Sequence, residues 1–472
     1  MPHLGFYDLI KFVLNNETVS TDLPPGITVL DFVRYHKNLK GTKIGCREGD
    51  CGACTILVGE LVEDKVKYRS MTSCLMPLEN ASGKHIVTIE GINPVDGSLT
   101  LVQQAMIDES GTQCGFCTVG FVMSLTGFCI DNTAKTPEMA VSAVDGNICR
   151  CTGYKSIERA ACWISRQLAE GDKPFVPDYF SDIASRLRNS IAETRHSALR
   201  TSHSFVGGGT DVYVQKPDAM AESDAAHLFY DEDLRGIRDK GDAIEIGGSV
   251  TVTDLLVSPV MQSIFPDLYK HLKLVSSTPI RNMATLAGNF VNASPIGDMT
   301  VWFLALDAEI EMCASPHVSK GGTRTMPLKD LYLGYKQLAK QPDEIITAIR
   351  FKKPSGDFRF NFEKISKRTY LDISTANTAT SMSIDGSLIR DAHVSAGGVA
   401  PIPLYLKQTS KFLRGREINE KTITAANEIM QSEISPISDV RGTEQYKRLL
   451  LRQLFRAHFV ELFATEDTET TE

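Results

Sequence analysis

Apolar and polar residues alternate with different periods along the chain, and the changes of period divide it into segments. Three short runs rich in apolar, β-branched or aromatic residues are typical of strands: 6–14, 54–60 and 85–91. Apolar positions within 28–36 recur instead at helical spacing behind Thr28, a side chain suited to capping a helix. We therefore expect a small sheet crossed by one helix over residues 1–92.

The next segment has a helical pattern. Four stretches with long apolar faces are expected to form helices: 98–110, 118–130, 136–144 and 156–171. The third begins with Thr136 as a cap and Pro137 at the first helical position, and the fourth ends at Gly171. These features predict a helical domain over 93–170, followed by a proline-containing linker over 171–189.

From residue 190 onward, short strands and helices alternate and glycines are frequent. A further break near residue 355 precedes strand-like stretches that give way to helices. We expect two domains here, over 190–354 and 355–463, and a disordered acidic tail over 464–472. The fold class predicted for the whole chain is multidomain α+β.

The composition of the chain argues against several classes of function. The chain has 472 residues, a formal net charge of −8 and 42% hydrophobic residues, which is typical of a soluble globular protein of about three domains. No basic cluster points to nucleic acid, no apolar run approaches the roughly 18 residues of a membrane span, and no signal peptide is expected. A cytoplasmic location follows as the expectation, in which the eleven cysteines indicate metal binding rather than disulfides.

The first set of cysteines has the spacing C-x4-C-x2-C, with a fourth cysteine after nineteen residues: Cys46, Cys51, Cys54 and Cys74. In plant-type ferredoxins, four thiolates at this spacing hold a 2Fe-2S cluster. The interleaved Gly45, Gly49 and Gly52 allow positive φ and close backbone approach, so that amide N–H groups can point at sulfur. Structural zinc is the alternative, although zinc sites more often pair two C-x2-C knuckles.

The second set of cysteines comprises two close pairs separated by thirty-one residues: Cys114, Cys117, Cys149 and Cys151. Each pair lies at the end of a predicted helix, and two such pairs can meet across a bundle and supply four sulfurs. By itself this pattern leaves zinc open, but a ferredoxin-like set in the same chain favours a second cluster. We expect Cys129, Cys162 and Cys313 to be ordinary core thiols.

Two glycine-rich segments indicate a flavin dinucleotide site. Residues 206–211 carry three consecutive glycines, a turn that can present N–H groups to a diphosphate. Residues 285–298 contain two tight turns, in which Thr285 and Asn289 could bond phosphate and Asp298 a ribityl or ribose hydroxyl. The alternative is a connector in which asparagine and aspartate serve as turn formers. Neither G-x-G-x-x-G nor a Walker motif occurs, so a Rossmann or P-loop site is unsupported.

Five motifs in order along about residues 5–460 resemble those of the xanthine dehydrogenase family of molybdenum hydroxylases. They are GTKIGCREGDCGACTILVG, QCGFCTVG, GNICRCTGY, VGGGTD and ATLAGNFVNASPIGD. More narrowly, the chain is similar to the small subunit that fuses the iron–sulfur domains to the FAD domain. The resemblance implies a β-grasp ferredoxin-like 2Fe-2S domain, a four-helix 2Fe-2S domain, a two-lobed α+β FAD-binding domain and an α+β C-terminal flavoprotein domain.

The resemblance also implies roles for individual residues. The second cysteine set would hold the cluster nearer molybdenum, with Gln113 touching the pterin, and the first set would hold the cluster nearer the flavin. Lys364 would lie near the flavin ring. The FAD-binding residues implied are Val206, Gly207, Gly208, Gly209, Thr210, Asp211, Thr285, Asn289, Ser294, Asp298, Ile346 and Lys364.

The function that the resemblance implies is electron transfer. Electrons from purine hydroxylation at a molybdenum pterin cofactor would pass through the two 2Fe-2S clusters to FAD and then to NAD⁺. About 470 residues cannot also hold a molybdenum-binding domain, so the expected partner is a separate large subunit, in a heterodimer or a heterotetramer of two small and two large subunits. No residue of this chain is expected to act on the substrate.

The sequence departs from the family pattern at two places. Val119 replaces the usual proline after the first cysteine pair of the second set, and Leu371 beside Asp372 thins the acidic run near the nicotinamide site. Oxygen or a carrier protein therefore stays open as the electron acceptor. An aldehyde, nicotinate or another N-heterocycle stays open as the substrate, and a zinc-stabilised scaffold without turnover is the alternative from another class.

Overall fold

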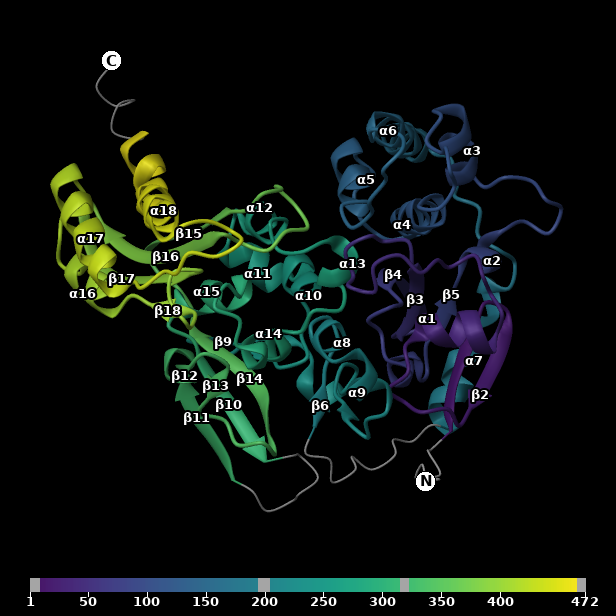
Figure 1. Ribbon diagram of the computed structural model, residues 1–472, viewed down its shortest axis with the longest axis horizontal. Helices are drawn as coiled ribbons and strands as arrows, with labels where there is room; N and C mark the ends of the chain where they lie inside the picture. The colour runs from purple at the N-terminus through teal and green to yellow at the C-terminus, as the bar shows by residue number, and fades with distance from the viewer. Residues whose placement is uncertain (1–8, 194–203, 315–321, 465–472) are drawn as a thin grey trace. The chain divides into compact units, whose positions relative to one another are not determined.

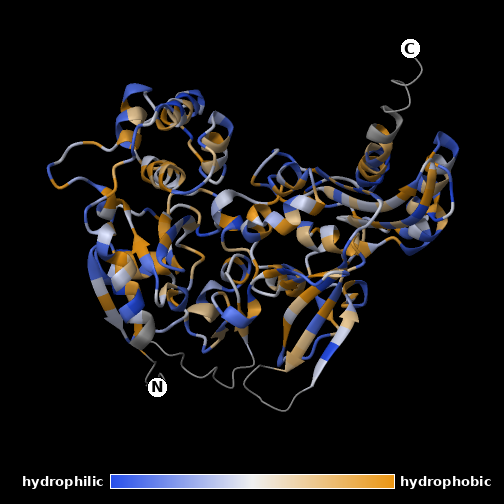
Figure 2. Ribbon diagram, turned by 180° about the vertical axis from the view of Figure 1, so that it is seen from behind, coloured by the Kyte–Doolittle hydropathy of each residue, from blue (hydrophilic) through white to orange (hydrophobic). Residues whose placement is uncertain are grey.

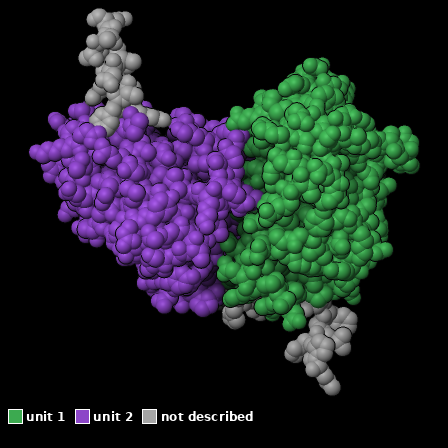
Figure 3. Space-filling view, turned by 45° about the horizontal axis from the view of Figure 1, so that its top comes forward, with its two compact units in different colours: residues 1–230, 277–284 green, residues 231–276, 285–472 purple. Residues whose placement is uncertain are grey.

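The computed structural model describes residues 9–193, 204–314 and 322–464, and its contacts divide the chain into two compact units (Figures 1 and 3). Unit 1 comprises 1–230 and 277–284, and unit 2 comprises 231–276 and 285–472. Each unit combines sheets with helices, so the predicted multidomain α+β class is confirmed. The expected tail lies outside the described residues except for Ala464, and the expected domain boundaries stay predictions.

The first part of unit 1 is a five-stranded sheet in the order β2-β1-β5-β3-β4. Its strands are β1 (Ile10–Leu14), β2 (Glu17–Thr21), β3 (Thr55–Val62), β4 (Lys65–Thr72) and β5 (His85–Val87). The expected crossing helix is α1 (Val29–Asp31), continued by a π-helical turn η1 (Phe32–His36), and the Thr28 hydroxyl accepts a hydrogen bond from the Asp31 N–H. In Figure 2 hydrophobic and hydrophilic residues alternate along the strands and helices, as expected where one face is buried.

The second part of unit 1 is helical and centres on one fully buried helix. Its helices are α2 (Ile89–Ile92), α3 (Leu101–Asp108), α4 (Thr118–Ile130), α5 (Pro137–Ala143) and α6 (Lys155–Glu170), and α3 to α6 gather around one another in Figure 1. Every residue of α4 from Gly120 to Cys129 is buried, which explains why this helix is apolar on all sides. Thr136 and Pro137 begin α5 and Gly171 ends α6, as predicted.

Helix α7 (Phe180–Glu193) occupies the second half of the predicted linker, where the sequence analysis expects no helix. Its residues Ile183 and Leu187, four positions apart, are buried against Val13 of β1. The rest of unit 1 consists of β6 (Phe205–Val206), α8 (Val212–Gln215), α9 (Pro217–Ala221), β7 (Ala226–His227) and α13 (Thr278–Arg281).

Unit 2 contains two larger sheets. The first has the order β11-β10-β14-β9-β8 and the second is antiparallel in the order β15-β16-β17-β18. Their strands are β8 (Ile237–Asp239), β9 (Ala243–Gly247), β10 (Glu309–Ala314), β11 (Thr323–Pro327), β14 (Glu344–Lys352), β15 (Asp357–Ile365), β16 (Ala376–Asp385), β17 (Leu388–Gly397) and β18 (Leu404–Tyr405). A small hairpin joins β12 (Tyr332–Gly334) to β13 (Gln337–Leu338).

The helices of unit 2 fall into two groups. One group comprises α10 (Val252–Val257), α11 (Pro259–Ile264), α12 (Leu268–Leu272), α14 (Leu286–Asn292) and α15 (Asp298–Leu304). Of these, α11 and α14 contact the first sheet, whereas α12 and α15 contact the second. The other packs on the second sheet around a shared apolar core: α16 (Lys407–Leu413), α17 (Glu420–Glu433) and α18 (Glu444–Ala464). None of the helices among the described residues combines the length and apolar content that a membrane crossing requires.

Each unit contains buried histidines, among them His85 in unit 1 and His458 in unit 2. In unit 1 the ring of His85 hydrogen-bonds to the Tyr68 hydroxyl at 2.7 Å and to the Asn15 carbonyl at 2.9 Å, and burial lowers its pKa to about 4. In unit 2 burial lowers the pKa of His458 on α18 to about 3. Both rings are therefore neutral in the folded protein at every pH above those values.

The free energy of unfolding should consequently fall as the pH drops below about 6.5. The unfolded chain then binds a proton at each histidine that the folded chain does not bind, so each ring removes about 2 kcal/mol of stability by pH 5. Urea titrations at about pH 7.5 and about pH 5 would measure this loss for each unit, because Trp163 reports on unit 1 and Trp302 on unit 2 through their fluorescence.

The variants His85→Gln and His458→Gln should flatten the pH dependence of unit 1 and unit 2 respectively, and His36→Gln, at an exposed position, should change neither. An unaltered pH dependence in both buried variants would show that other groups carry the effect.

Candidate functional site

The first cysteine set lies on the loop before β3 and on the segment that follows β4. Cys46 and Cys51 are half-buried, and Cys54 and Cys74 are buried. A Cβ on Gly45 would lie 2.5 Å from the Cys51 sulfur, so only glycine fits at that position. Gly49 and Gly52 adopt φ values of +80° and +67°, which glycine reaches without strain. The predicted positive φ is thus confirmed at Gly49 and Gly52.

The sulfurs of this set interact as two pairs. Cys46 hydrogen-bonds with Cys51, and Cys54 with Cys74. The Cys51 thiol and the N–H groups of Glu48, Cys51 and Asp50 lower the pKa of Cys46 to about 5, although burial opposes them. The same hydrogen bond, together with burial, raises the pKa of Cys51, so Cys46 is the thiol of this pair that ionises first.

The second cysteine set lies just before α4 and α6. The Cys114 and Cys151 sulfurs are 3.6 Å apart, and Cys117 hydrogen-bonds with Cys149. Burial raises the pKa of Cys149, but hydrogen bonds from the Thr152 hydroxyl at 3.2 Å and from the N–H groups of Thr152 and Cys151 outweigh it and lower the pKa overall. Cys114 and Cys151 are exposed, whereas Cys149 is buried.

The pairwise arrangement distinguishes between the two predicted metals. Structural zinc gathers four sulfurs around one ion. A 2Fe-2S cluster with four cysteines instead takes two thiolates on each of its two irons. Two sulfur pairs in each set fit that cluster.

The two cysteine loops touch through their backbones. The Ile148 N–H donates to the Cys51 carbonyl at 3.0 Å, and the Asn147 side-chain amide donates to the Gly52 carbonyl at 3.2 Å. A Cβ on Gly120 of α4 would lie 2.1 Å from the same Gly52 oxygen. Because Ile148 directly precedes Cys149, one hydrogen bond joins a ligand residue of the first set to the chain segment that carries the second.

The glycine turn of residues 206–211 belongs to unit 1. Positions 208 and 209 must be glycine, because a Cβ would lie 1.8 Å from the Met283 carbonyl oxygen or 2.4 Å from that of Leu75. Among the described residues, no acceptor takes the N–H groups of four consecutive positions, 207 to 210. A row of unpaired N–H groups fits a diphosphate, as the sequence predicts.

The other residues assigned to FAD belong to unit 2, where several support helix termini. The Thr285 hydroxyl caps α14 by accepting from the Gly288 N–H at 3.2 Å, and the Asn289 side-chain oxygen accepts from the N–H and hydroxyl of Thr300 at 3.1 and 3.0 Å. Ser294 accepts from the Ile296 N–H at 3.4 Å within the following turn. These three side-chain oxygens therefore stabilise turns and helix ends, which is the alternative role that the sequence analysis left open for this segment.

Ile346, the remaining residue assigned to FAD in this part of the chain, is buried on β14. Its backbone carbonyl, rather than its side chain, makes the close contact with Gly248. A Cβ on Gly248 would lie 2.1 Å from the Ile346 carbonyl oxygen. The Gly248 carbonyl in turn accepts from the Ala287 N–H at 3.0 Å, which places the start of α14 against this strand.

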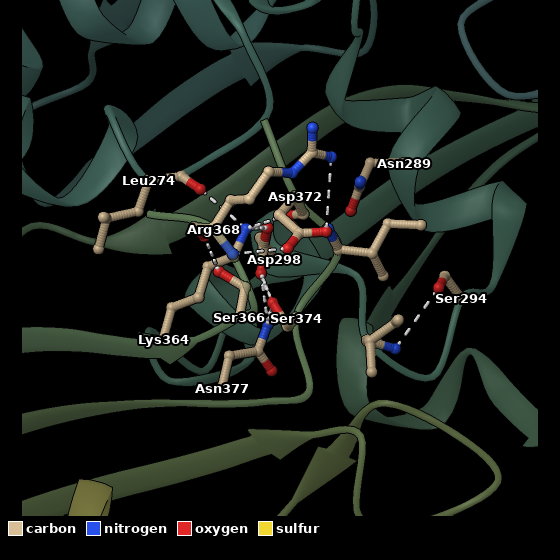
Figure 4. Close-up of polar contacts among 12 residues, drawn as sticks. Leu274, Asn289, Ser294, Asp298, Lys364, Ser366, Arg368, Asp372, Ser374 and Asn377 are labelled. Atoms are coloured by element: carbon tan, nitrogen blue, oxygen red, sulfur yellow. Dashed lines mark hydrogen bonds and ion pairs between the residues drawn. The ribbon is translucent and has the colours of Figure 1, made fainter. Parts of the chain in front are cut away.

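Asp298 is the centre of a buried polar network (Figure 4). Lys364 donates to one carboxylate oxygen at 2.7 Å, and Ser374 and Asn377 donate to the other at 2.6 and 2.5 Å. A carboxylate offers about four acceptor positions, so Asp298 retains one for a hydroxyl group of a ligand. Ser374 and Asn377 were not predicted, since a serine and an asparagine within a strand-like stretch carry no distinctive signal.

The ammonium of Lys364 is fully engaged within unit 2. Besides Asp298, it donates to the Leu274 carbonyl at 2.8 Å and the Asp372 carbonyl at 2.9 Å, and only 1% of its side chain is exposed. All three ammonium protons thus have acceptors. These contacts show that Lys364 holds the Asp298 carboxylate in one orientation. This role was not predicted from the sequence.

Four family models match the chain in succession. Residues 12–79 match the 2Fe-2S iron-sulfur cluster binding domain and residues 88–162 the 2Fe-2S binding domain. Residues 182–353 match the FAD binding domain in molybdopterin dehydrogenase, and residues 362–462 the CO dehydrogenase flavoprotein C-terminal domain.

Known relatives are similar over most of the chain. A xanthine dehydrogenase of Emericella nidulans is 29% identical over 88% of this chain, and Aldehyde oxidase 4 of Cavia porcellus is 25% identical over 97%. The chain spans 35% and 39% of the length of these two proteins. Among solved structures, carbon monoxide dehydrogenase from Hydrogenophaga pseudoflava aligns with a TM-score of 0.49 and 24% identity, covering 54% of this chain and 88% of that one.

The matched domains account for both cysteine sets and for the segments predicted to bind FAD. Two iron–sulfur domains, an FAD-binding domain and a flavoprotein C-terminal domain follow one another in a single chain, together with sequence similarity to xanthine dehydrogenases. The chain therefore belongs to the iron–sulfur and FAD-binding proteins of the molybdenum hydroxylase family.

Proposed function

We propose that this chain is the iron–sulfur and FAD electron-transfer subunit of a xanthine dehydrogenase. It acts with a separate large subunit, whose molybdenum cofactor hydroxylates the purine, and NAD⁺ is the final electron acceptor. The observation that carries the proposal is the 3.0 Å hydrogen bond from the Ile148 N–H to the Cys51 carbonyl, because it connects the two cysteine sets directly. The xanthine dehydrogenases among the relatives support the substrate.

Bound 2Fe-2S clusters transfer one electron at a time, and bound FAD exchanges electrons singly or in pairs. The residues of this chain fix where these groups are held. The two cysteine sets bind the clusters, and within unit 1 the N–H groups of residues 207 to 210 suit the FAD diphosphate. Within unit 2, Asp298 suits a ribityl or ribose hydroxyl. Lys364 orients Asp298 and excludes water from its carboxylate.

The exposed half of the second cysteine set is the proposed contact with the large subunit. Cys114 and Cys151 are exposed, and two large apolar side chains beside them, Phe116 and Tyr154, are 46% and 44% exposed. Exposed aromatic residues are characteristic of protein interfaces. Gln113 is exposed next to Cys114, where the family resemblance places the pterin.

A sister function with another substrate is the second candidate. Aldehyde oxidase 4 of Cavia porcellus is about as similar to the chain as several of the xanthine dehydrogenases are. The electron route through this chain is the same in both cases, and the substrate pocket lies on the large subunit. Substrate assays therefore decide between the two.

The test is xanthine-dependent NAD⁺ reduction by the tagged chain, purified without oxygen together with its large subunit. We expect xanthine to bleach the cluster and flavin absorbance and NADH to appear. Bleaching by xanthine without NADH would overturn the acceptor and leave oxygen or a carrier protein. Bleaching by an aldehyde or an N-heterocycle, but not by xanthine, would favour the sister function, and a colourless zinc-containing preparation would refute both.

Removing one thiolate from each cysteine set should remove one cluster at a time. The native chain should hold about four iron atoms, two per cluster, and Cys117→Ser and Cys54→Ser should each hold about two. Iron analysis and electron paramagnetic resonance (EPR) of the reduced protein measure this, with a different signal missing in each variant. Cys162→Ser, a half-buried thiol outside both sets, serves as the control and should keep all the iron.

Replacing Lys364 with methionine should weaken both unit 2 and its hold on FAD. The change leaves the charge of Asp298 buried without its cation, which costs about 3–5 kcal/mol, and FAD content should fall. The double variant Asp298→Leu/Lys364→Met replaces the ion pair by apolar groups and should recover most of that stability, but it should remain deficient in FAD.

Trp302 fluorescence during urea unfolding measures the stability of unit 2, and flavin absorbance after gel filtration measures FAD. A double variant that retains a full complement of FAD would reduce the Asp298–Lys364 pair to a purely structural role.

A further inference from the structure

Segment 277–284 belongs to unit 1, although the residues on either side of it belong to unit 2. It contains the short helix α13 (Thr278–Arg281). The sequence analysis placed this segment within the FAD domain and gave it no role. Its contacts within unit 1 reach both cysteine loops.

The strongest contact is a buried ion pair with the loop that leads to Cys149. Arg281 donates to one carboxylate oxygen of Asp145 at 2.6 Å, and the Thr278 N–H donates to the other at 2.6 Å. Only 4% of each charged side chain is exposed. Such a pair gains little net stability from its charges, because both must be stripped of water. The ion pair therefore acts mainly on geometry, because it allows the loop before Cys149 few orientations.

The same loop is fixed on its other side by the first cysteine loop. Asn147 donates to the Gly52 carbonyl at 3.2 Å and accepts from the Ser124 hydroxyl at 2.8 Å. The next residue, Ile148, donates to the Cys51 carbonyl, and Cys149 follows. Three residues thus lie between the anchored Asp145 and the proposed cluster ligand Cys149.

Helix α13 also lies against the first cysteine loop and the sheet behind it. A Cβ on Gly49 would lie 2.8 Å from the Ile280 side chain, and the Asn282 side-chain amide donates to the Ser70 carbonyl at 2.8 Å. A Cβ on Gly146 would lie 2.9 Å from Pro279. One rigid turn therefore contacts residues beside both sets of cysteines.

We propose that Asp145 and Arg281 are positioning residues for the two clusters. They hold residues 145–149 so that the Ile148 N–H stays on the Cys51 carbonyl, and this contact raises the reduction potential of the first cluster. A hydrogen-bond donor near a cluster ligand favours the reduced, more negative state. The inference rests on the proposed function only in requiring that both clusters are present.

The test is an anaerobic redox titration of the complex with its large subunit, in which EPR follows each cluster separately. Asp145→Asn keeps the shape of the side chain but removes its charge. We expect the midpoint potential of the first cluster and its EPR spectrum to change, while the iron content stays the same; the lost negative charge raises the potential, and the loosened loop lowers it. Arg281→Lys, which keeps the positive charge, should lie closer to the native protein.

Two further variants make the outcome decisive. Glu109→Gln breaks the exposed ion pair with Arg159 in the same helical part and should leave both potentials unchanged. Asn147→Ala acts on the same loop without changing its charge, so it tests the sign, and it should make the midpoint potential of the first cluster more negative. It therefore remains informative if Asp145→Asn does not fold.

Unchanged potentials and EPR spectra in Asp145→Asn and Asn147→Ala, with or without lower thermal stability, would overturn the proposal and leave the ion pair with a purely structural role. Absence of two EPR signals from the native complex would instead be a failure of the proposed function, so the two failures can be told apart.

Discussion

The backbone contact at Gly52 constrains the whole of unit 1. At this point the first cysteine loop, the buried helix α4 and the loop before Cys149 meet so closely that Gly52 and Gly120 have no space for a Cβ. A Cβ on Gly52 would lie 2.4 Å from the Gly146 carbonyl oxygen, and a Cβ on Gly120 would lie 2.1 Å from the Gly52 oxygen. Backbone approaches of this kind need glycine on both sides. They allow main-chain hydrogen bonds to connect the two cysteine sets without an intervening side chain, which keeps the sets in a fixed relation.

Local features of the fold followed from the sequence because their causes lie within a few residues. The Thr28 and Thr136 caps, the Pro137 start of α5 and the Gly171 end of α6 all occur where the pattern predicts them. Each depends on one side chain or one backbone angle, which a short window of sequence specifies. The cysteine spacing is similarly local, although the pairing of sulfurs between distant segments became visible only in the structure.

What the sequence could not predict depends on contacts between distant segments. Helix α7 has only a narrow apolar stripe, and it is stabilised by burying Ile183 and Leu187 against Val13, some 170 residues earlier in the chain. The partners of Asp298 come from β15 and from the start of β16, between 66 and 79 residues further along the chain. The membership of segment 277–284 in unit 1 is the clearest case, since nothing in its composition distinguishes it from its neighbours. Pattern and propensity specify elements, but tertiary contacts decide where those elements pack.

One physical argument applies to both buried ion pairs. Lys364–Asp298 in unit 2 and Arg281–Asp145 in unit 1 each place two opposite charges where hydrophobic residues of similar size would serve stability as well or better. In both, the carboxylate is also held by neutral donors, Ser374 and Asn377 in one case and the Thr278 N–H in the other. A carboxylate held by several donors has one orientation. That is of little use to a core, but it is what a redox site needs, because the groups around a cofactor must keep one geometry while electrons pass. The free-energy cost of burying these charges is therefore best explained by the proposed electron transfer rather than by folding.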